Sequence, residues 1–450
     1  LDIPLRALYE APTIAGLARL IEQVQSHDGL HSLCYTPTLE LAQEARLDDA
    51  VTAVDQPSPK AGPPQEVFVT GVSGYVGAFL LAELLQKLPT AYFHCLVQAH
   101  SDEAGLARLR RNLERYGLWA GAYTARIHPV LGDLAQERLG LTPDAFDRLA
   151  GQIDAIYHSG AQVDHVRSYE VLKPSNVLGT HEVLRLACHR RVKPLHFLST
   201  LSVLYPPSYR AAGVASEADV AGPLSLLPNG YMQSKCVAEH LVLQAMARGV
   251  PCAIYRLGAI AGDSRTGACN SGDIFYSALR TSAALGIADD LDTDQTMVPV
   301  DHAARVLVAV SLRKSALGQV FHICPRETFT WLDMIRSLRQ YGYRIAIRSY
   351  SECMDLLREV ARQGSSVPMV TFLPFLTQRH PGQSRYILES YYAMIRYDST
   401  NLCAALQEAG EDPLPSPRDL VRLYFDHLRR TGLLPPSTER AAAISQAATV

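Results

Sequence analysis

The segment EVFVTGVSGYVGAFLLAELLQ, residues 66–86, decides the fold of this chain. Its apolar start predicts a buried strand that ends at Gly71, and helical spacing of apolar residues begins at Val76. Two further glycines, Gly74 and Gly77, stand at the same turn. Glycine allows close backbone approaches that a Cβ forbids, and the free amides of a new helix attract negative charge. The segment therefore predicts a strand–loop–helix unit that binds the pyrophosphate of a dinucleotide.

The spacing of the glycines is unusual. It is G-x-x-G-x-x-G, whereas standard dehydrogenases have G-x-G-x-x-G. A bare glycine triplet also occurs in ordinary tight turns. The buried-type strand before the turn and the amphipathic helix after it favour the dinucleotide loop.

Composition excludes several classes of protein. The chain has 450 residues, of which 48% are hydrophobic and 19% charged, so two or three domains with a large core are expected. A net charge of −3 gives no reason to expect a nucleic-acid partner. Nine cysteines without a C-x-x-C pair predict neither a metal site nor a disulfide framework, and favour a reducing, cytoplasmic location. No apolar run reaches the roughly 18 residues of a membrane span.

The beginning of the chain differs from the rest. Residues 1–25 contain one amphipathic helix that follows Thr13 and cannot form a core alone. Residues 26–62, which enter the run QPSPKAGPPQ, are typical of a linker. The sequence PTIAGLARLI resembles the last helix of an acyl or peptidyl carrier protein. The alternative is a plain N-terminal helix that packs on the main body. Because the chain begins at Leu1, we expect it to be part of a longer protein.

Predicted strands and helices alternate over residues 63–263. This order predicts an α/β fold, a Rossmann-like doubly wound parallel sheet with right-handed crossovers. A smaller, mostly helical C-terminal substrate-binding lobe is expected over residues 264–435, with about 297–323 returning to the first domain. Residues 436–450 are expected to form a flexible tail.

Thr200, Tyr231 and Lys235 form the candidate catalytic set. Tyr231 and Lys235 are four residues apart in a predicted helix, so they share one face. An ammonium beside a phenol lowers the phenol pKa, and the tyrosine can then protonate a carbonyl oxygen as hydride arrives. Thr200 ends a predicted strand and could stabilise the oxyanion. An isolated Y-x-x-x-K is usually a surface pair, and the neighbouring hydroxyls of Ser199 and Ser202 are alternatives to Thr200.

With these motifs in place, the chain resembles an extended short-chain dehydrogenase/reductase. More narrowly, it is similar to the terminal thioester reductase domains of nonribosomal peptide synthetases, polyketide synthases and carboxylic acid reductases. The matching pieces include VFVTGVSGYVGAFLLAELL, HSGAQVDHVRSYEVLKPSNVLGTHEVLRLA, FLSTLSV, YMQSKCVAEHLV and YRLGAIAGDSRTG. Together they lie within residues 66–273.

The resemblance assigns roles residue by residue. It implies a pyrophosphate cradle, an adenine contact, a ribose contact and the catalytic set already described. In that order, the implied residues are Gly71, Ser73, Gly74, Tyr75 and Gly77; Asp133; Ser159, Gly160 and Ala161; and Thr200, Tyr231 and Lys235.

The cofactor implied is NADPH. Related chains usually have an arginine after the second strand to grip the 2′-phosphate, whereas this chain has Gln98. Glutamine cannot form a charged bidentate contact. Arg108 matches a second basic position and could hold the phosphate, although an exposed helix face would also explain it. A second departure is Leu257, where the family tends to have proline.

The resemblance implies reductive release of an acyl or peptidyl thioester from an upstream carrier protein, as an aldehyde or, after a second reduction, an alcohol. A free-standing fatty acyl reductase, a sugar-nucleotide epimerase or dehydratase, and a non-enzymatic dinucleotide sensor are the alternatives. The oligomeric state is not readable from the residues, and a monomer is the working expectation. Weaker candidates for the site are His158, His165, Asn176, Arg256 and Asp301.

Overall fold

The computed structural model describes most of the chain from residue 43 to residue 436. Residues 13, 15 and 18 are also described, and the gaps are 55, 205–212, 223, 225–226, 328, 365–366, 379–385, 387 and 390–395. The predicted carrier-like helix and the predicted tail therefore lie outside the described residues, apart from those three positions and residue 436.

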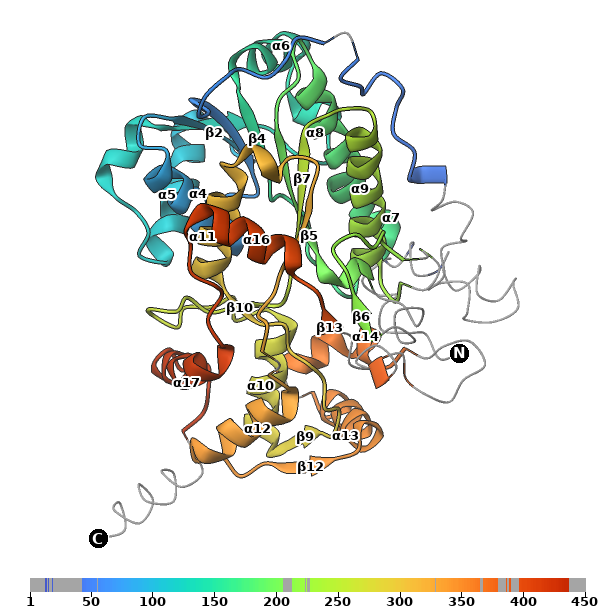
Figure 1. Ribbon diagram of the computed structural model, residues 1–450. Helices are drawn as coiled ribbons and strands as arrows, with labels where there is room; N and C mark the ends of the chain where they lie inside the picture. The colour runs from blue at the N-terminus through green and yellow to red at the C-terminus, as the bar shows by residue number, and fades with distance from the viewer. Residues whose placement is uncertain are drawn as a thin grey trace.

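A parallel sheet of seven strands forms the larger part of the molecule (Figure 1). All pairs in this sheet are parallel, which confirms the predicted doubly wound α/β fold. Across the sheet the strands are β3 (Ile127–Leu131), β2 (Tyr92–Val97), β1 (Glu66–Thr70), β4 (Ala155–His158), β5 (Leu195–Thr200), β7 (Cys252–Leu257) and β11 (Val320–Ile323).

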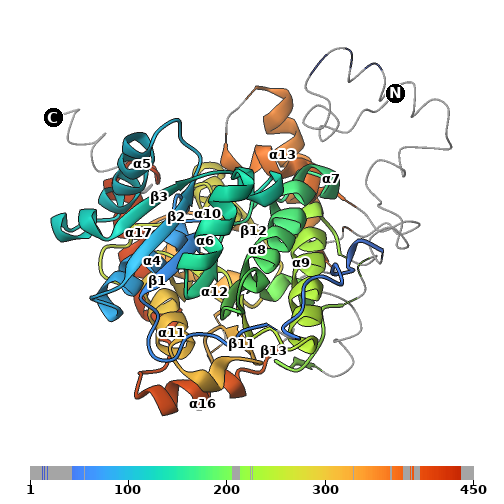
Figure 2. The same cartoon turned by 90° about the horizontal axis from the view of Figure 1, so that it is seen from above.

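Helices cover both faces of this sheet, as the view from above shows (Figure 2). On one face of the sheet, apolar strand residues form a buried cluster with four helices. These are α4 (Tyr75–Lys87), α5 (Asp102–Arg115), α11 (Val300–Ser311) and α16 (Thr400–Ala409). A second cluster joins the other face to α6 (Pro143–Gln152), α7 (Tyr169–Lys173), α8 (Gly179–Cys188) and α9 (Gly230–Ala247). Two buried faces explain why the strands read as continuous apolar runs.

A smaller lobe lies below the carboxyl edge of the sheet in Figure 1. Two apolar clusters of its own hold it together. Its helices are α10 (Ile274–Leu285), α12 (Trp331–Gln340), α13 (Tyr350–Arg362), α14 (Leu373–Leu376) and α17 (Val421–Arg430). Short parallel pairs complete it and join it to the large domain: β9 (Ile287–Asp289) with β12 (Ala346–Arg348), β8 (Ile260–Ala261) with β10 (Val298–Pro299), and β6 (Val214–Ala215) with β13 (Arg396–Tyr397).

The helical segment between β4 and β5 begins at Tyr169 and is interrupted by a π-turn over Pro174–Leu178. Proline has no N–H to donate into the helical ladder, so the hydrogen-bond spacing widens there. The turn contains the buried Asn176. Its amide nitrogen donates to Ser234 Oγ at 2.9 Å, and its oxygen accepts from Gln162 N at 2.7 Å. Asn176 thus ties the segment after β4 to α9.

Residues 43–62, the described part of the predicted linker, pack along the large domain (blue in Figure 1). We call this segment the strap. Leu47 and Val51 are buried in the same cluster as α8 and α9. Arg248 donates to the carbonyls of Asp48 at 2.6 Å and Leu47 at 3.2 Å. Glu44, at its start, accepts from Tyr169 and Lys173 of α7.

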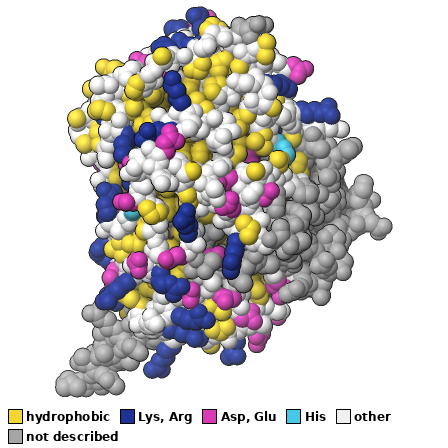
Figure 3. All heavy atoms as spheres, viewed as in Figure 1, with side chains coloured by type: hydrophobic (Ala, Val, Ile, Leu, Met, Phe, Trp, Pro, Cys, Tyr) yellow, Lys and Arg dark blue, Asp and Glu magenta, His cyan; other side chains and the backbone are white. Residues whose placement is uncertain are grey.

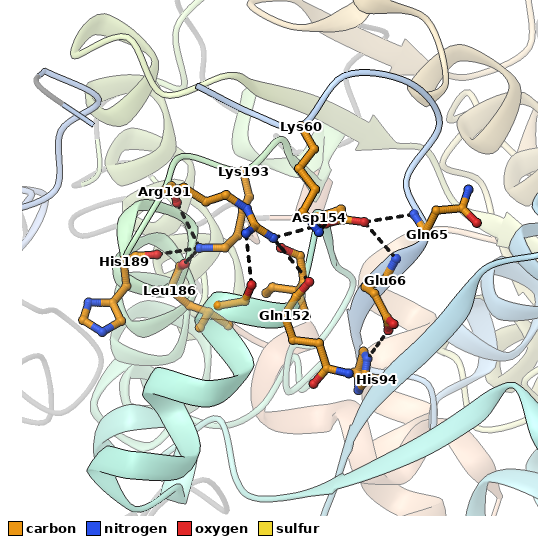
Figure 4. A network of polar contacts seen from close by, with 12 residues as sticks. Lys60, Gln65, Glu66, His94, Gln152, Asp154, Leu186, His189, Arg191 and Lys193 are labelled. Atoms are coloured by element: carbon orange, nitrogen blue, oxygen red, sulfur yellow. Dashed lines mark hydrogen bonds and ion pairs between the residues drawn. The ribbon is translucent and has the colours of Figure 1, made fainter. Parts of the chain in front are cut away.

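Asp154 anchors the far end of the strap, as Figure 4 shows. Its carboxylate pairs with Lys60 at 2.5 Å and Arg191 at 3.1 Å, and accepts from the amides of Gln65 and Glu66 at 3.1 Å. Next to it, the buried Lys193 donates to three backbone carbonyls near the end of α8. The strap therefore enters β1 from a fixed position.

On the face shown in Figure 3, cationic and anionic side chains are interspersed among apolar ones. Among the described residues, no helix is long and apolar enough to cross a membrane.

Candidate active site

The glycine turn lies where β1 and β4 end side by side. Gly71 has φ of +79°, and a Cβ added to it would lie 2.6 Å from the amide nitrogen of Gly160. A Cβ on Gly77 would lie 2.1 Å from the carbonyl oxygen of Gly71. Gly71 therefore lets the turn touch the segment after β4, and Gly77 lets α4 start directly behind the turn.

The start of α4 fits a phosphate group. Gly74 is its N-cap residue, no side chain caps the helix, and the first turn carries no acidic residue. Uncapped amides at a helix N-terminus attract anions. These amides, with a cradle that side chains at Gly71 and Gly77 would fill, fit the pyrophosphate of a dinucleotide.

Two side chains support the turn from outside. Asn112 of α5 donates to the carbonyls of Val72 at 2.8 Å and Gly74 at 2.9 Å. The sequence gives no local signal for this role, because Asn112 reads as an ordinary polar helix residue. Tyr75 lines the site, and its hydroxyl is placed 2.9 Å from the carbonyls of both Ala261 and Ala268. Its hydroxyl thus fastens the turn to the segment after β8.

His158 connects the turn to α8 through a buried chain of hydrogen bonds. Thr180 donates to the carbonyl of Asn176 at 2.7 Å, so His158 Nε2 must donate to Thr180 at 3.0 Å. His158 Nδ1 then accepts from Thr70 at 2.7 Å, and Thr70 accepts from Gly160 N at 2.9 Å. Burial lowers the pKa of His158 to about 3, so the ring is neutral at pH 7. These contacts give His158 a positioning role.

Lys235 is buried on α9, four residues after Tyr231. Its Nζ donates to the carbonyl of Leu198 at 2.8 Å and lies 4.1 Å from the ring centre of Phe197. Burial lowers the pKa of Lys235 to about 7, partly offset by the charge of Glu239. The lysine thus sits against β5, the strand that ends at Thr200.

The hydroxyls beside Thr200 have different partners. Ser199 donates to Glu239, which forms a fully buried ion pair with Arg256 at 2.7 Å. Ser199 also lines the cavity, but its hydroxyl proton is donated to this buried pair. Thr200 accepts from Ser202 N at 3.2 Å and lies on the cavity wall with Ser202. The geometry favours Thr200 over Ser199 for contact with a substrate.

One cavity of about 670 Å³ brings the predicted residues together. This volume lies in the range of ligand pockets. The wall on the side of the sheet contains Gly71, Ser73, Gly74, Tyr75, Gly77, Ser159, Ala161, Thr200, Tyr231 and Lys235. The same cavity continues into the smaller lobe, where Trp331, Met354, Phe375 and Tyr397 are among the lining residues. A cofactor and an acyl chain could therefore share one enclosure.

Gln98, Arg108, Asp133 and Gly160 do not line this cavity. Gln98 and Asp133 follow β2 and β3, the strands next to the glycine turn. Arg108 Nη1 donates to the carbonyl of Gln98 at 2.7 Å, and Asp133 accepts from Ala135 N at 2.9 Å. Gly160 packs under the turn against Thr70. The first three residues thus lie together near the carboxyl ends of β2 and β3, outside the cavity.

His165 is a cavity residue that joins the two halves of the site. Its ring meets Tyr231 edge-on at 5.7 Å and stacks on Phe375 at 5.8 Å. Asp301, another weak candidate, binds Ser264 instead. Among the described residues, no group of three His, Cys, Asp or Glu side chains could hold a metal ion.

Residues 69–307 match the family model described as male sterility protein. The chain is 40% identical over 366 residues to a linear gramicidin synthase polypeptide of Brevibacillus parabrevis, covering 80% of this chain and 7% of that protein. It is 30% identical over 480 residues to the L-2-aminoadipate reductase large subunit of Penicillium chrysogenum, covering 98% of this chain and 33% of that protein. The chain thus spans a minor part of these curated relatives.

A solved structure gives a match along nearly its whole length. It is the terminal R domain from the myxalamid PKS-NRPS biosynthetic pathway, 35% identical, with a TM-score of 0.81. The match covers 89% of this chain and 99% of that domain. The family that this chain matches, together with its glycine turn, identifies the cofactor as a nicotinamide dinucleotide. The chain belongs to the male sterility protein family and, within it, to the terminal reductase domains of peptide and polyketide synthases.

Proposed function

We propose that this chain is an NADPH-dependent reductase that releases an acyl or peptidyl thioester from the phosphopantetheine arm of an upstream carrier protein. The product is an aldehyde, and a second reduction of that aldehyde would give an alcohol. The observation that carries the proposal is the single cavity shared by the glycine turn, Thr200, Tyr231, Lys235 and the smaller lobe.

The residues of this cavity suit the chemistry of a thioester carbonyl. When bound, NADPH would supply the hydride that the carbonyl carbon accepts. Tyr231 donates a proton to the carbonyl oxygen, and the hydroxyl of Thr200 donates a hydrogen bond to the same oxygen. The resulting hemithioacetal then breaks its C–S bond, which leaves an aldehyde and the free thiol of the arm. Lys235, with its pKa brought to about 7 by burial, favours loss of the tyrosine proton when it is charged.

NADPH, rather than NADH, is proposed because of Arg108. Its guanidinium lies against the carbonyl of Gln98, at the end of the strand next to the glycine turn. The side chain of Arg108 is exposed, so its remaining donors can meet a 2′-phosphate. Among Gln98, Arg108 and Asp133, Arg108 supplies the positive charge.

The upstream carrier protein is proposed from the length of the relatives and from the strap. Both curated relatives extend well beyond the matched part, and their names describe a peptide synthase and a reductase. The first residues of the strap lie beside α7, where Glu44 accepts from Tyr169. The start of α7 in turn packs against Gly230, immediately before Tyr231. A carrier protein joined to the start of the strap would therefore be attached near the cavity.

Tyr231→Phe tests the reaction. With a pantetheine thioester and NADPH, we expect the variant to lose at least about a hundredfold in kcat, because general acid catalysis contributes roughly 10²–10⁴-fold. Tyr92→Phe is the control, because Tyr92 is exposed on β2. The measurements are NADPH oxidation, product mass, and the same assay with NADH. Full activity of Tyr231→Phe would contradict the assigned role, and equal use of NADH would contradict the cofactor preference.

A further inference from the structure

The part of the cavity formed by the smaller lobe is acidic. Asp273, Asp289 and Asp294 line it. Among the described residues that line the cavity, Lys235 is the only lysine or arginine, and it lies on α9 with the catalytic set. None of the three aspartates forms an ion pair with another described residue.

These three carboxylates are half-buried in the cavity wall. Burial raises the pKa of Asp289 to about 6 and raises the pKa of Asp273 and Asp294 in the same direction. Backbone amides of Phe275, Leu291 and Phe329 each donate to one of them. Arg396 lowers the pKa of Asp294 through its charge without forming an ion pair. Half-buried carboxylates whose hydrogen-bond donors are neutral backbone amides gain free energy when a cation enters.

Trp331 provides an independent sign of a ligand. It is 6% exposed, it lines the same cavity, and its Nε1–H has no hydrogen-bond partner among the described residues. A buried donor without a partner costs free energy that an entering acceptor would recover. The indole ring can also attract a cation over its face.

The contacts of Trp331 with Phe275 and Thr293 place it near two of the carboxylates, those of Asp273 and Asp294. Its ring meets Phe275 edge-on at 6.1 Å, and Phe275 follows Asp273 by two residues at the start of α10. Its backbone N–H donates to the carbonyl of Thr293, the residue before Asp294, at 2.9 Å. Asp273, Trp331 and Asp294 therefore border one part of the cavity surface, which we call the acidic wall.

We propose that this wall binds a protonated primary amine on the acyl or peptidyl group, while Trp331 Nε1–H donates to a carbonyl oxygen of the same group. The preferred substrate is thus an amine-bearing aminoacyl or peptidyl thioester rather than a plain fatty acyl thioester. This inference rests on the proposed function and names the substrate class of the same cavity.

Three matched pantetheine thioesters test the proposal. Nα-acetyl-norleucyl carries no amine, norleucyl carries an α-amine, and Nα-acetyl-lysyl carries a side-chain amine. We expect kcat/KM for at least one amine-bearing thioester to exceed that for the neutral one by about tenfold or more, which a single charge-assisted contact can supply. The double variant Asp273→Asn/Asp294→Asn should remove this preference by lowering kcat/KM for the amine-bearing thioester to the level of the neutral one. Asparagine keeps the N-cap that Asp273 provides to α10.

Asp292→Asn is the matched control, because Asp292 is exposed, lies in the same segment and does not line the cavity. It should keep the preference. Binding of the corresponding non-reducible pantetheine amides, measured by calorimetry, gives the same comparison without turnover. Equal kcat/KM for all three thioesters, or a preference that survives the double variant, overturns the inference while reductase activity persists. Loss of reduction for every thioester would instead contradict the proposed function.

Discussion

At the scale of single residues, the site depends on positions where neighbouring atoms leave no room for a side chain larger than that of glycine. Gly71 combines a positive φ with a neighbouring strand end at contact distance. Thr70 and His158 hold that strand end through one chain of hydrogen bonds. A change at Gly71 therefore alters both the turn and the position of Gly160.

Gly71→Ala should weaken both folding and dinucleotide binding. A left-handed conformation costs a non-glycine residue about 1–2 kcal/mol, and the added Cβ also meets backbone atoms of Ser159 and Gly160. Gly117→Ala is the control, because Gly117 has φ of +68° with no atom within 4 Å of the added Cβ. Urea unfolding should show a larger loss for Gly71→Ala, and fluorescence titration should show NADPH affinity reduced only in that variant. Similar losses in both would mean that the contact with β4 is unimportant.

At the scale of elements, the strap and α9 act together. α9 carries Tyr231 and Lys235 near its start and presents Gln244 and Arg248 to the strap near its end. The burial of Leu47 and Val51 adds apolar contact to these hydrogen bonds. Because one helix bears both functions, the strap is joined to the element that holds the catalytic pair.

Arg248→Ala should release the strap. The variant removes the Arg248 donor from the carbonyls of Leu47 and Val51, at a cost of about 1–3 kcal/mol where they are buried, whereas the carbonyl of Asp48 still accepts from Val51 N. Hydrogen exchange of residues 43–54 should become faster, while exchange within β5 should stay unchanged. Arg362→Ala is the control, because Arg362 is exposed and, among the described residues, its one ion pair is with Glu359. Unchanged exchange in the strap would show that its apolar contacts and its hydrogen bonds to Gln244 and α7 retain it without the Arg248 side chain.

At the scale of the whole molecule, buried imidazoles couple stability to pH. His158, His196 and His322 are buried, and burial lowers the pKa of each to about 3. In the unfolded chain their pKa is about 6.5, so below that pH the unfolded state binds more protons than the folded state. Stability from these three groups is therefore fully present above about pH 6.5 and is lost as pH falls toward 3.

Acid should destabilise this protein steeply. Each histidine contributes about 1.4 kcal/mol per pH unit once the unfolded form is protonated, so together they give about 4 kcal/mol per unit below pH 6. Urea unfolding at a series of pH values measures this slope. His196→Gln should reduce the slope by about one third, even if it lowers stability at pH 7. A slope that is unaffected by this change would show that other groups govern the acid transition.

Local spacing in the sequence determined much of this protein. The glycine turn, the alternating strands and helices, and the four-residue step from Tyr231 to Lys235 each depend on neighbours in the chain. Their physical basis is backbone freedom, burial periodicity and helical repeat, so fold class and the candidate catalytic set could be predicted.

The tertiary structure alone decided how distant segments meet. The hydroxyl of Tyr75 binds carbonyls of Ala261 and Ala268, nearly two hundred residues away. Asn112 holds the glycine turn, and the strap is buried against α9, although both segments read as polar or irregular in the sequence. The acidic wall combines Asp273, Asp294 and Trp331 from separate elements. Such contacts depend on packing between segments, and no local periodicity records which side chains that packing brings together.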